Sequence, residues 1–149
     1  MKYLYFAIAF IILSSGCKPE TKPGWQEMPV TDEFGNDTGE TQLRVNGYKL
    51  SSGLKEAYIT YHILEDLISG GYKPIFTISI NGSSSSENVI IETPDNQKVE
   101  FECYDGIIFN IDAESDNVER LSELMKYKEL RLSQDSYSFT INASGFTTD

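Results

Sequence analysis

Few residues of this chain have side chains suited to nucleophilic, acid–base or metal chemistry. There is one histidine, His62, and there are two cysteines, Cys17 and Cys103. A metal site built on several histidines is therefore excluded, and a catalytic triad would need His62 beside a nucleophile and an acid. His62 lies in an alternating segment on the same face as Tyr58 and Thr60. This pattern predicts a half-buried strand histidine.

Cys103 alternates with Val99 and Phe101 along a second segment. Alternate residues of a strand share a face, so the pattern predicts that the thiol is buried in the core as a small apolar group. An unpaired cysteine in an oxidising compartment can instead act as a nucleophile or link two chains. That alternative stays open.

Acidic side chains crowd the segment 31–40, where two glycines and an asparagine favour a loop. Hard oxygen ligands suit calcium, and the candidate ligands are Asp32, Asp37 and Glu40. Their spacing does not match an EF-hand loop, so a solvated acidic turn is the favoured interpretation. We expect no metal and no cofactor.

A second acidic group precedes and enters a predicted helix, where the helix dipole favours negative charge. Its members are Asp112, Glu114, Asp116, Glu119 and Glu123. A carboxylate pair for glycoside hydrolysis meets only in three dimensions, and such enzymes need a long cleft. The GSSSS segment 82–86 lacks the lysine of a phosphate-binding loop. The sequence therefore predicts a protein that is not an enzyme.

The first seventeen residues resemble the lipobox-type signal peptide of bacterial lipoproteins. Lys2 precedes eleven uncharged residues, YLYFAIAFIIL, which are about half of what a membrane-spanning helix needs. Small residues then lead to Cys17 in the order Ser14-Ser15-Gly16-Cys17. The sequence departs from the family at Ser14, where leucine is preferred. A cleaved secretory signal with an incidental cysteine is the alternative.

The resemblance implies that residues 1–16 are removed and that Cys17 carries acyl chains such as palmitate. Two or more chains hold a protein stably on a membrane. Residues 17–23 would form the anchor and tether, and residues 24–149 a single domain. Lys18 follows the cysteine, which by the family's sorting rule implies the outer membrane. The membrane leaflet stays open.

Short alternating segments separated by turn residues predict an antiparallel β-protein. Asn46-Gly47 favours a hairpin turn, and a bulge in one continuous strand is the alternative. Residues 54–68 fit a strand or a helix, and their β-branched and aromatic content favours a strand. The expected strands are Trp25–Val30, Thr41–Val45, Ile75–Ile80, Val89–Thr93, Lys98–Tyr104, Ile107–Ile111, Leu130–Leu132 and Tyr137–Ile141.

One helix is predicted, from Asp116 to Tyr127, with Asp116 and Glu119 in a capping box. The expected fold is mostly β: an antiparallel β-sandwich or partly open barrel with this short helix. Trp25, the segment 32–35 and the segment Tyr137 to Phe146 resemble small secreted bacterial β-sandwich domains. The ending is similar to that of the invasion-associated locus B family. This resemblance implies a fold and no chemistry.

The chain of 149 residues carries 23 acidic against 12 basic residues, a net charge of −11. This balance excludes nucleic acid as a partner, because phosphate contacts need clustered lysine and arginine. The sequence predicts a lipid-anchored binding or interaction module of the cell envelope, with an envelope protein or glycan as partner. An inhibitor or immunity lipoprotein against a basic, lysozyme-like envelope enzyme is one alternative. A small envelope enzyme that uses Cys103 or a carboxylate pair is another.

Overall fold

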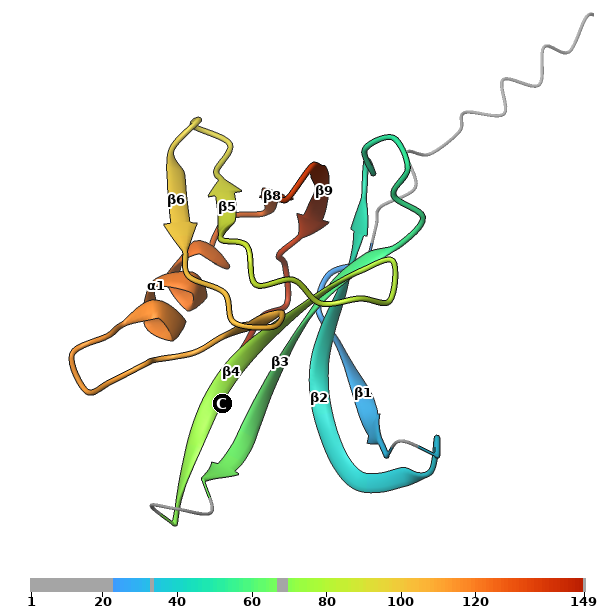
Figure 1. Ribbon diagram of the computed structural model, residues 1–149, viewed down its shortest axis with the longest axis vertical. Helices are drawn as coiled ribbons and strands as arrows, with labels where there is room; N and C mark the ends of the chain where they lie inside the picture. Colours follow the sequence, from blue (N-terminus) through green and yellow to red (C-terminus); the bar gives the residue numbers. More distant parts are fainter. Residues whose placement is uncertain (1–22, 33, 67–69, 149) are drawn as a thin grey trace, which may run out of the picture.

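The computed structural model describes residues 23–32, 34–66 and 70–148. The predicted signal segment 1–16 and Cys17 lie outside the described residues. The described part forms nine strands in one antiparallel sheet, in the order β6-β5-β8-β9-β2-β3-β4-β7, with β1 paired to β2 (Figure 1). The strands are β1 (Gln26–Thr31), β2 (Asp37–Tyr48), β3 (Ala57–Asp66), β4 (Gly71–Ile80), β5 (Val89–Glu92), β6 (Lys98–Phe101), β7 (Ile107–Ile108), β8 (Glu129–Gln134) and β9 (Tyr137–Asn142).

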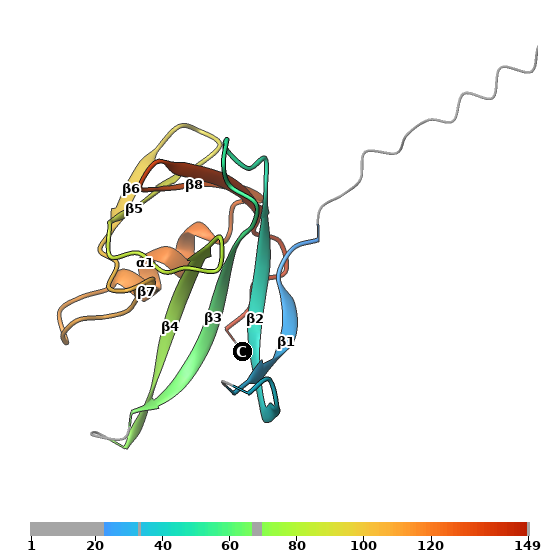
Figure 2. The same ribbon diagram turned by 45° about the vertical axis from the view of Figure 1, so that its right-hand side comes forward.

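The sheet curls into a nearly closed, barrel-like body, which confirms the predicted fold class. Its path ends at β6 on one side and at β7 on the other. The single described helix, α1 (Asn117–Leu124), lies beside β6 and β4 in both views (Figures 1 and 2). Val118 and Leu121 of α1 are buried in the core, as is Met125 just after it. The helix therefore covers the opening between the ends of the sheet.

Alternating strand residues supply the core, whose largest fully buried side chains include Phe76, Phe101 and Phe139. Trp25 packs at one end, 5.1 Å from the ring of Phe146 and 6.2 Å from that of Phe76. The backbone N–H of Trp25 donates to Ser144 O at 2.9 Å. The first and last described segments therefore lie side by side.

Two hairpins form where turn residues predict them. β5 and β6 pair around residues 94–97, with Asn96 at a φ of 63°. Tyr104 and Ile107 exchange backbone hydrogen bonds around Asp105 and Gly106, whose φ values are 51° and 78°. Positive φ at both central positions is what a twisted two-residue hairpin needs. β7 then ends at Ile108, three residues earlier than expected.

The predicted hairpin turn at Asn46-Gly47 is wrong. β2 continues through both residues, pairing with β3 over Leu43–Asn46 and with β9 at Gly47 and Tyr48. A Cβ on Gly47 would lie 2.6 Å from Cδ2 of Phe139, so glycine serves close packing here rather than a turn. The loop predicted over 31–40 is also too long, because β2 begins at Asp37.

The segment 54–68 is a strand from Ala57, as its composition favours, and β4 begins at Gly71 rather than after Pro74. The register explains how β4 accommodates Pro74. Pro74 pairs with Ile63, while Ile78, four pairs further along, donates its N–H away from β3 to Gly106 O. Backbone directions alternate along a strand, so the nitrogen of Pro74 also points away from β3. The ladder therefore loses no donor.

The predicted helix forms, but it ends at Leu124, three residues before Tyr127, and its predicted capping box does not form. The side chain of Asp116 makes no capping hydrogen bond, and it lies 3.9 Å from Arg120 instead. Asn110 takes over the role: its Oδ1 accepts from the N–H of Val118 at 3.0 Å, and its Nδ2 donates to Glu119 at 2.8 Å. A residue outside the helix thus satisfies an N-terminal donor, which local spacing cannot reveal.

Candidate binding site

β2 and β3 separate beyond a short shared ladder. Leu43–Asn46 pair with Tyr58–Tyr61, but β2 starts at Asp37 and β3 runs on to Asp66. The outer part of β2 stays paired to β1, and the outer part of β3 to β4. The result is two hairpin arms that diverge from the body (Figures 1 and 2). We call these arms the fork and give them the sequence bounds 26–43 and 61–75, within which Glu33 and residues 67–69 lie outside the described part of the chain.

A cleft of about 480 Å³ lies where the two arms part. Its apolar lining includes Leu43, Tyr61, Ile63 and Tyr72, and its polar lining includes Glu40. Thr147 and Thr148, near the end of the described chain, also line it. The cleft therefore combines apolar surface with a carboxylate, and each of its two arms is paired by its own ladder.

Beyond its ladder with β2, β3 directs into this split backbone groups that no other described strand pairs. The N–H of Asn81 donates to Glu56 O, which shows that even-numbered residues of β3 direct their backbone groups toward β4. The oxygen of Ala57 lies on the other side, close to Gly47 of β2. By this alternation Ile63 and Glu65 direct their N–H and C=O groups into the split. An exposed strand edge of this kind is a template for another strand.

His62 and Glu40 form a contact across the base of the split. Nε2 of His62 lies 3.5 Å from Oε2 of Glu40. The histidine side chain is 15% exposed, which confirms the half-buried position predicted for it. A histidine–carboxylate pair acts as a catalytic base when a nucleophile adjoins it. The contact joins β2 to β3, while Cys103 lies in the segment after β6.

The fork carries most of the acidic excess of the chain. Residues 26–43 and 61–75 contain seven acidic residues and one lysine, a net charge of −6 out of −11. The acidic residues are Glu27, Asp32, Glu33, Asp37, Glu40, Glu65 and Asp66. A field of one sign on projecting elements favours a partner of opposite charge.

The fork also exposes large apolar side chains. Phe34 is 81% and Tyr72 is 74% exposed, and Met28, Ile63 and Leu64 are exposed as well. These are five of the eight exposed large hydrophobic residues in the described part of the chain. Their concentration on two arms differs from the single, scattered hydrophobic residues found on most surfaces.

The calcium candidates have separate local roles. Asp32 accepts hydrogen bonds from the side chain and backbone of Asn36, which lower the pKa of its carboxyl group. Asp37 accepts from the N–H of Gly39 at 2.8 Å, and Glu40 faces His62. Within the described ranges, no group of three or more His, Cys, Asp or Glu side chains is placed to hold a metal.

Cys103 is 3% exposed, so its predicted burial is confirmed. Its Sγ–H donates to Ser85 O at 3.5 Å, and burial raises the pKa of the thiol. Gln134, which is also buried, donates to Ser85 O and Glu87 O and fixes the same loop. A buried thiol with a raised pKa is a poor nucleophile.

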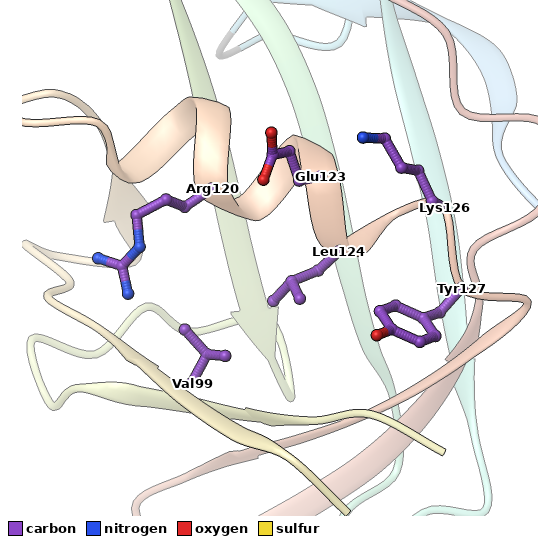
Figure 3. A pocket seen from close by; sticks show the side chains of 6 residues that line it. All are labelled: Val99, Arg120, Glu123, Leu124, Lys126 and Tyr127. Carbon is purple, nitrogen blue, oxygen red and sulfur yellow. The ribbon is translucent and has the colours of Figure 1, made fainter. Parts of the chain in front are cut away.

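A second groove, of about 540 Å³, lies between α1 and β6 (Figure 3). Arg120, Leu124, Val99 and Tyr127 point toward one another there. The guanidinium of Arg120 is 3.9 Å from Asp116 and 5.3 Å from the centre of the Phe101 ring. These contacts hold the guanidinium of Arg120 against the protein's own surface. Less of the groove's charge is therefore available to a ligand than in the fork.

The second acidic group predicted near the helix does not converge on one point. Asp112 accepts from the N–H groups of Glu114 and Ser115 and closes its own turn. Asp116 pairs with Arg120, and Glu119 accepts from Asn110. These carboxylates stabilise the approach to α1, in keeping with the expected helix-end role.

Comparison of the chain with family models, with curated proteins and with solved structures finds no match. No helix in the described residues has the length and apolar character needed to cross a membrane.

Sequence reasoning missed the fork, although it placed Asp32, Asp37 and Glu40 near one another. The edge formed by Ile63 and Glu65 depends on β2 parting from β3, which is a property of the tertiary fold. One signal was available in the sequence. The alternation of β3 runs beyond Tyr61 into a mixture of apolar and acidic residues, a pattern typical of a strand end that leaves the core.

Proposed function

We propose that this protein is a lipid-anchored binding module of a bacterial cell envelope and that the fork holds its partner. The observation that carries the proposal is an acidic, apolar-lined cleft bordered by an unpaired strand edge. In this proposal the acylated Cys17 anchors the chain to the outer membrane. The partner is a protein, because a strand edge recognises main-chain groups.

The orientation of β1 supports this arrangement. β1 begins at Gln26 next to the body, where Trp25 contacts Ser144, and runs to Thr31 near the end of its arm (Figure 2). A tether of residues 17–23 spans at most about 25 Å when fully extended. It would join the domain at the end opposite the arm tips, so the arms would point away from the membrane.

The proposal that the domain is not an enzyme rests on the separation of its reactive groups. His62 contacts Glu40 at the base of the fork, whereas Cys103 is buried beside Ser85. Nucleophilic catalysis needs the base within hydrogen-bonding reach of the nucleophile. A binding role uses the exposed apolar and acidic groups of the fork as they stand.

Site-specific crosslinking in living cells tests the proposal. A photoreactive amino acid replaces Tyr72 on the fork in one variant and Tyr104, which is 49% exposed outside the fork, in a matched control. We expect a discrete crosslinked protein band from position 72 and none from position 104. Equal patterns from both positions, or no band from either, would contradict a partner site on the fork.

The charge of the fork specifically favours one alternative, an inhibitor or immunity lipoprotein. A net charge of −6 on two projecting arms fits the cleft of a basic, envelope-directed enzyme. Purified domain added to a basic lysozyme would then slow peptidoglycan hydrolysis, and added salt would relieve the inhibition. Undiminished hydrolysis at low salt would remove this alternative.

A further inference from the structure

We propose that the fork binds an extended, basic polypeptide segment, which adds as a strand to the inner edge of β3. This inference rests on the proposed function, because it specifies the chemistry of the partner at the same site. The bound segment would use the backbone groups of Ile63 and Glu65, which β2 leaves unpaired. Main-chain hydrogen bonds supply affinity in such complexes, and alternate side chains supply specificity.

The side chains around this edge suit an incoming strand. Ile63, Tyr61 and Tyr72 line one side of the cleft, and Ile63 and Tyr72 are largely exposed. Side chains of a strand alternate between its faces, so every second residue of the added segment would pack on this apolar surface. The remaining residues would face the other side of the sheet, where Glu40 contacts His62, while Glu65 shares the face of Ile63.

Charge identifies the occupant as a basic segment. The fork carries a net charge of −6, and its only Lys or Arg is Lys73. Acidic residues beside an open edge repel acidic strands and disfavour pairing with apolar ones, which would bury the charge; this is a common protection against unwanted pairing. They would also repel the fork of a second copy of this chain, since two such forks bring like charges together. A segment rich in lysine or arginine meets neither obstacle.

The other free edges are less suitable. β7 has two residues and β6 has four, and β6 adjoins the groove in which Arg120 and Lys126 lie. β3 extends five residues beyond its last pair with β2, from His62 to Asp66. Unlike β6 and β7, the edge of β3 borders the acidic cleft and its apolar lining.

Three synthetic probes test the inference against the full-length protein with Cys17→Ser, which removes the proposed acylation site. One is an acetylated octapeptide that alternates lysine and valine. The second replaces each lysine with glutamate, and the third is the lysine peptide with alternate backbone nitrogens methylated. We expect calorimetric binding by the first peptide alone. Amide hydrogen exchange should slow at residues 62–66 when it binds.

A pair of variants separates backbone from side-chain recognition. Ile63→Pro removes the N–H that faces the split without removing a donor from the β3–β4 ladder. Ile63→Ala keeps that N–H and shortens the side chain. We expect Ile63→Pro to weaken binding of the lysine peptide about tenfold more than Ile63→Ala does, the equivalent of one lost hydrogen bond. If Ile63→Pro does not fold, the methylated peptide makes the same test on the unaltered domain.

A second matched pair tests charge. Glu40→Gln with Glu65→Gln removes two charges from the fork, whereas Glu87→Gln with Glu114→Gln removes two exposed charges elsewhere. We expect the fork pair to weaken binding about threefold to tenfold more than the control pair at low salt, with the difference shrinking as salt rises. Equal losses in the two pairs would overturn the charge argument.

Several other outcomes would overturn the inference of a basic strand added at the fork. Equal binding of the acidic or methylated peptide, or slowed exchange at α1 and β6 instead of β3, would overturn strand addition at the fork. A sedimenting dimer that Ile63→Pro dissociates would make a second copy the occupant and overturn the basic segment. No binding up to about 1 mM would overturn the inference, while crosslinking through position 72 would leave the proposed function standing. If the crosslink through position 72 is also absent, both the inference and the proposed function are contradicted.

Discussion

Replacing Gly47 with alanine tests the packing that lets β2 pass from one partner strand to the other. The new Cβ would lie 2.6 Å from Cδ2 of Phe139 and 3.2 Å from the oxygen of Ala57. Carbon atoms in contact prefer about 3.5–4.0 Å, so the ring or the strand must move by about 1 Å. Phe139 is 1% exposed in a close-packed core and has little room to move.

The expected cost follows from these distances. Overpacking a core costs about 1–3 kcal/mol. The lower backbone entropy of alanine in the unfolded chain offsets about 0.5–1 kcal/mol of this. We therefore expect Gly47→Ala to lower the free energy of unfolding by about 1–2 kcal/mol, with urea denaturation followed by circular dichroism as the assay.

Two controls identify the cause. Gly39→Ala introduces a methyl group into open space at a φ of 82°, so it reports backbone strain without a clash. Phe139→Leu shortens the side chain that clashes. In the Phe139→Leu background, Gly47→Ala should therefore lower the free energy of unfolding by about 1 kcal/mol less than it does in the original domain. Additive effects of the two substitutions, or a Gly47→Ala domain as stable as the original, would refute the close-packing argument.

Three further predictions concern the two cysteines and metal binding. Cells fed labelled palmitate should label the wild-type protein and not Cys17→Ser, and label that survives the substitution would exclude Cys17 as the lipid site. Strong chelator should leave the thermal midpoint of residues 24–149 unchanged, whereas a large fall would point to calcium at Asp32, Asp37 and Glu40. Because burial raises the pKa of Cys103, the native domain should react slowly with a thiol reagent and the denatured domain quickly. Cys103→Ala should cost about 1 kcal/mol, and fast labelling of the native domain would contradict the burial.

Local turn chemistry made the hairpins at 94–97 and at Asp105-Gly106 predictable. In both, the pattern of strand residues on each side agrees with the turn residues, so local and tertiary preferences coincide. At Asn46-Gly47 they conflict. The dipeptide favours a turn, but the Phe139 ring and two partner strands, which come from distant parts of the chain, keep β2 extended.

The candidate site was less predictable than the fold for the same reason. The acidic residues of 31–40 were visible in the sequence, but their isolated roles as turn caps and as a partner of His62 were not. The open edge at Ile63 and Glu65 exists only because β2 turns away to accompany β1. Pairing between distant strands determines that geometry, and no local spacing records it.

The hydrogen bond between Trp25 and Ser144 has a consequence for how this domain can be combined with others. Gly24 approaches Ser144 so closely that a Cβ there would lie 2.0 Å from the Ser144 oxygen. The chain thus enters the body beside Ser144, four residues before the last described residue, Thr148, which lines the fork cleft. A unit with this layout can be spliced into a surface loop of a host protein, or circularly permuted with new ends at the exposed turn Asp95-Asn96. Because Thr148 lines the cleft, a splice at this end would lie beside the fork.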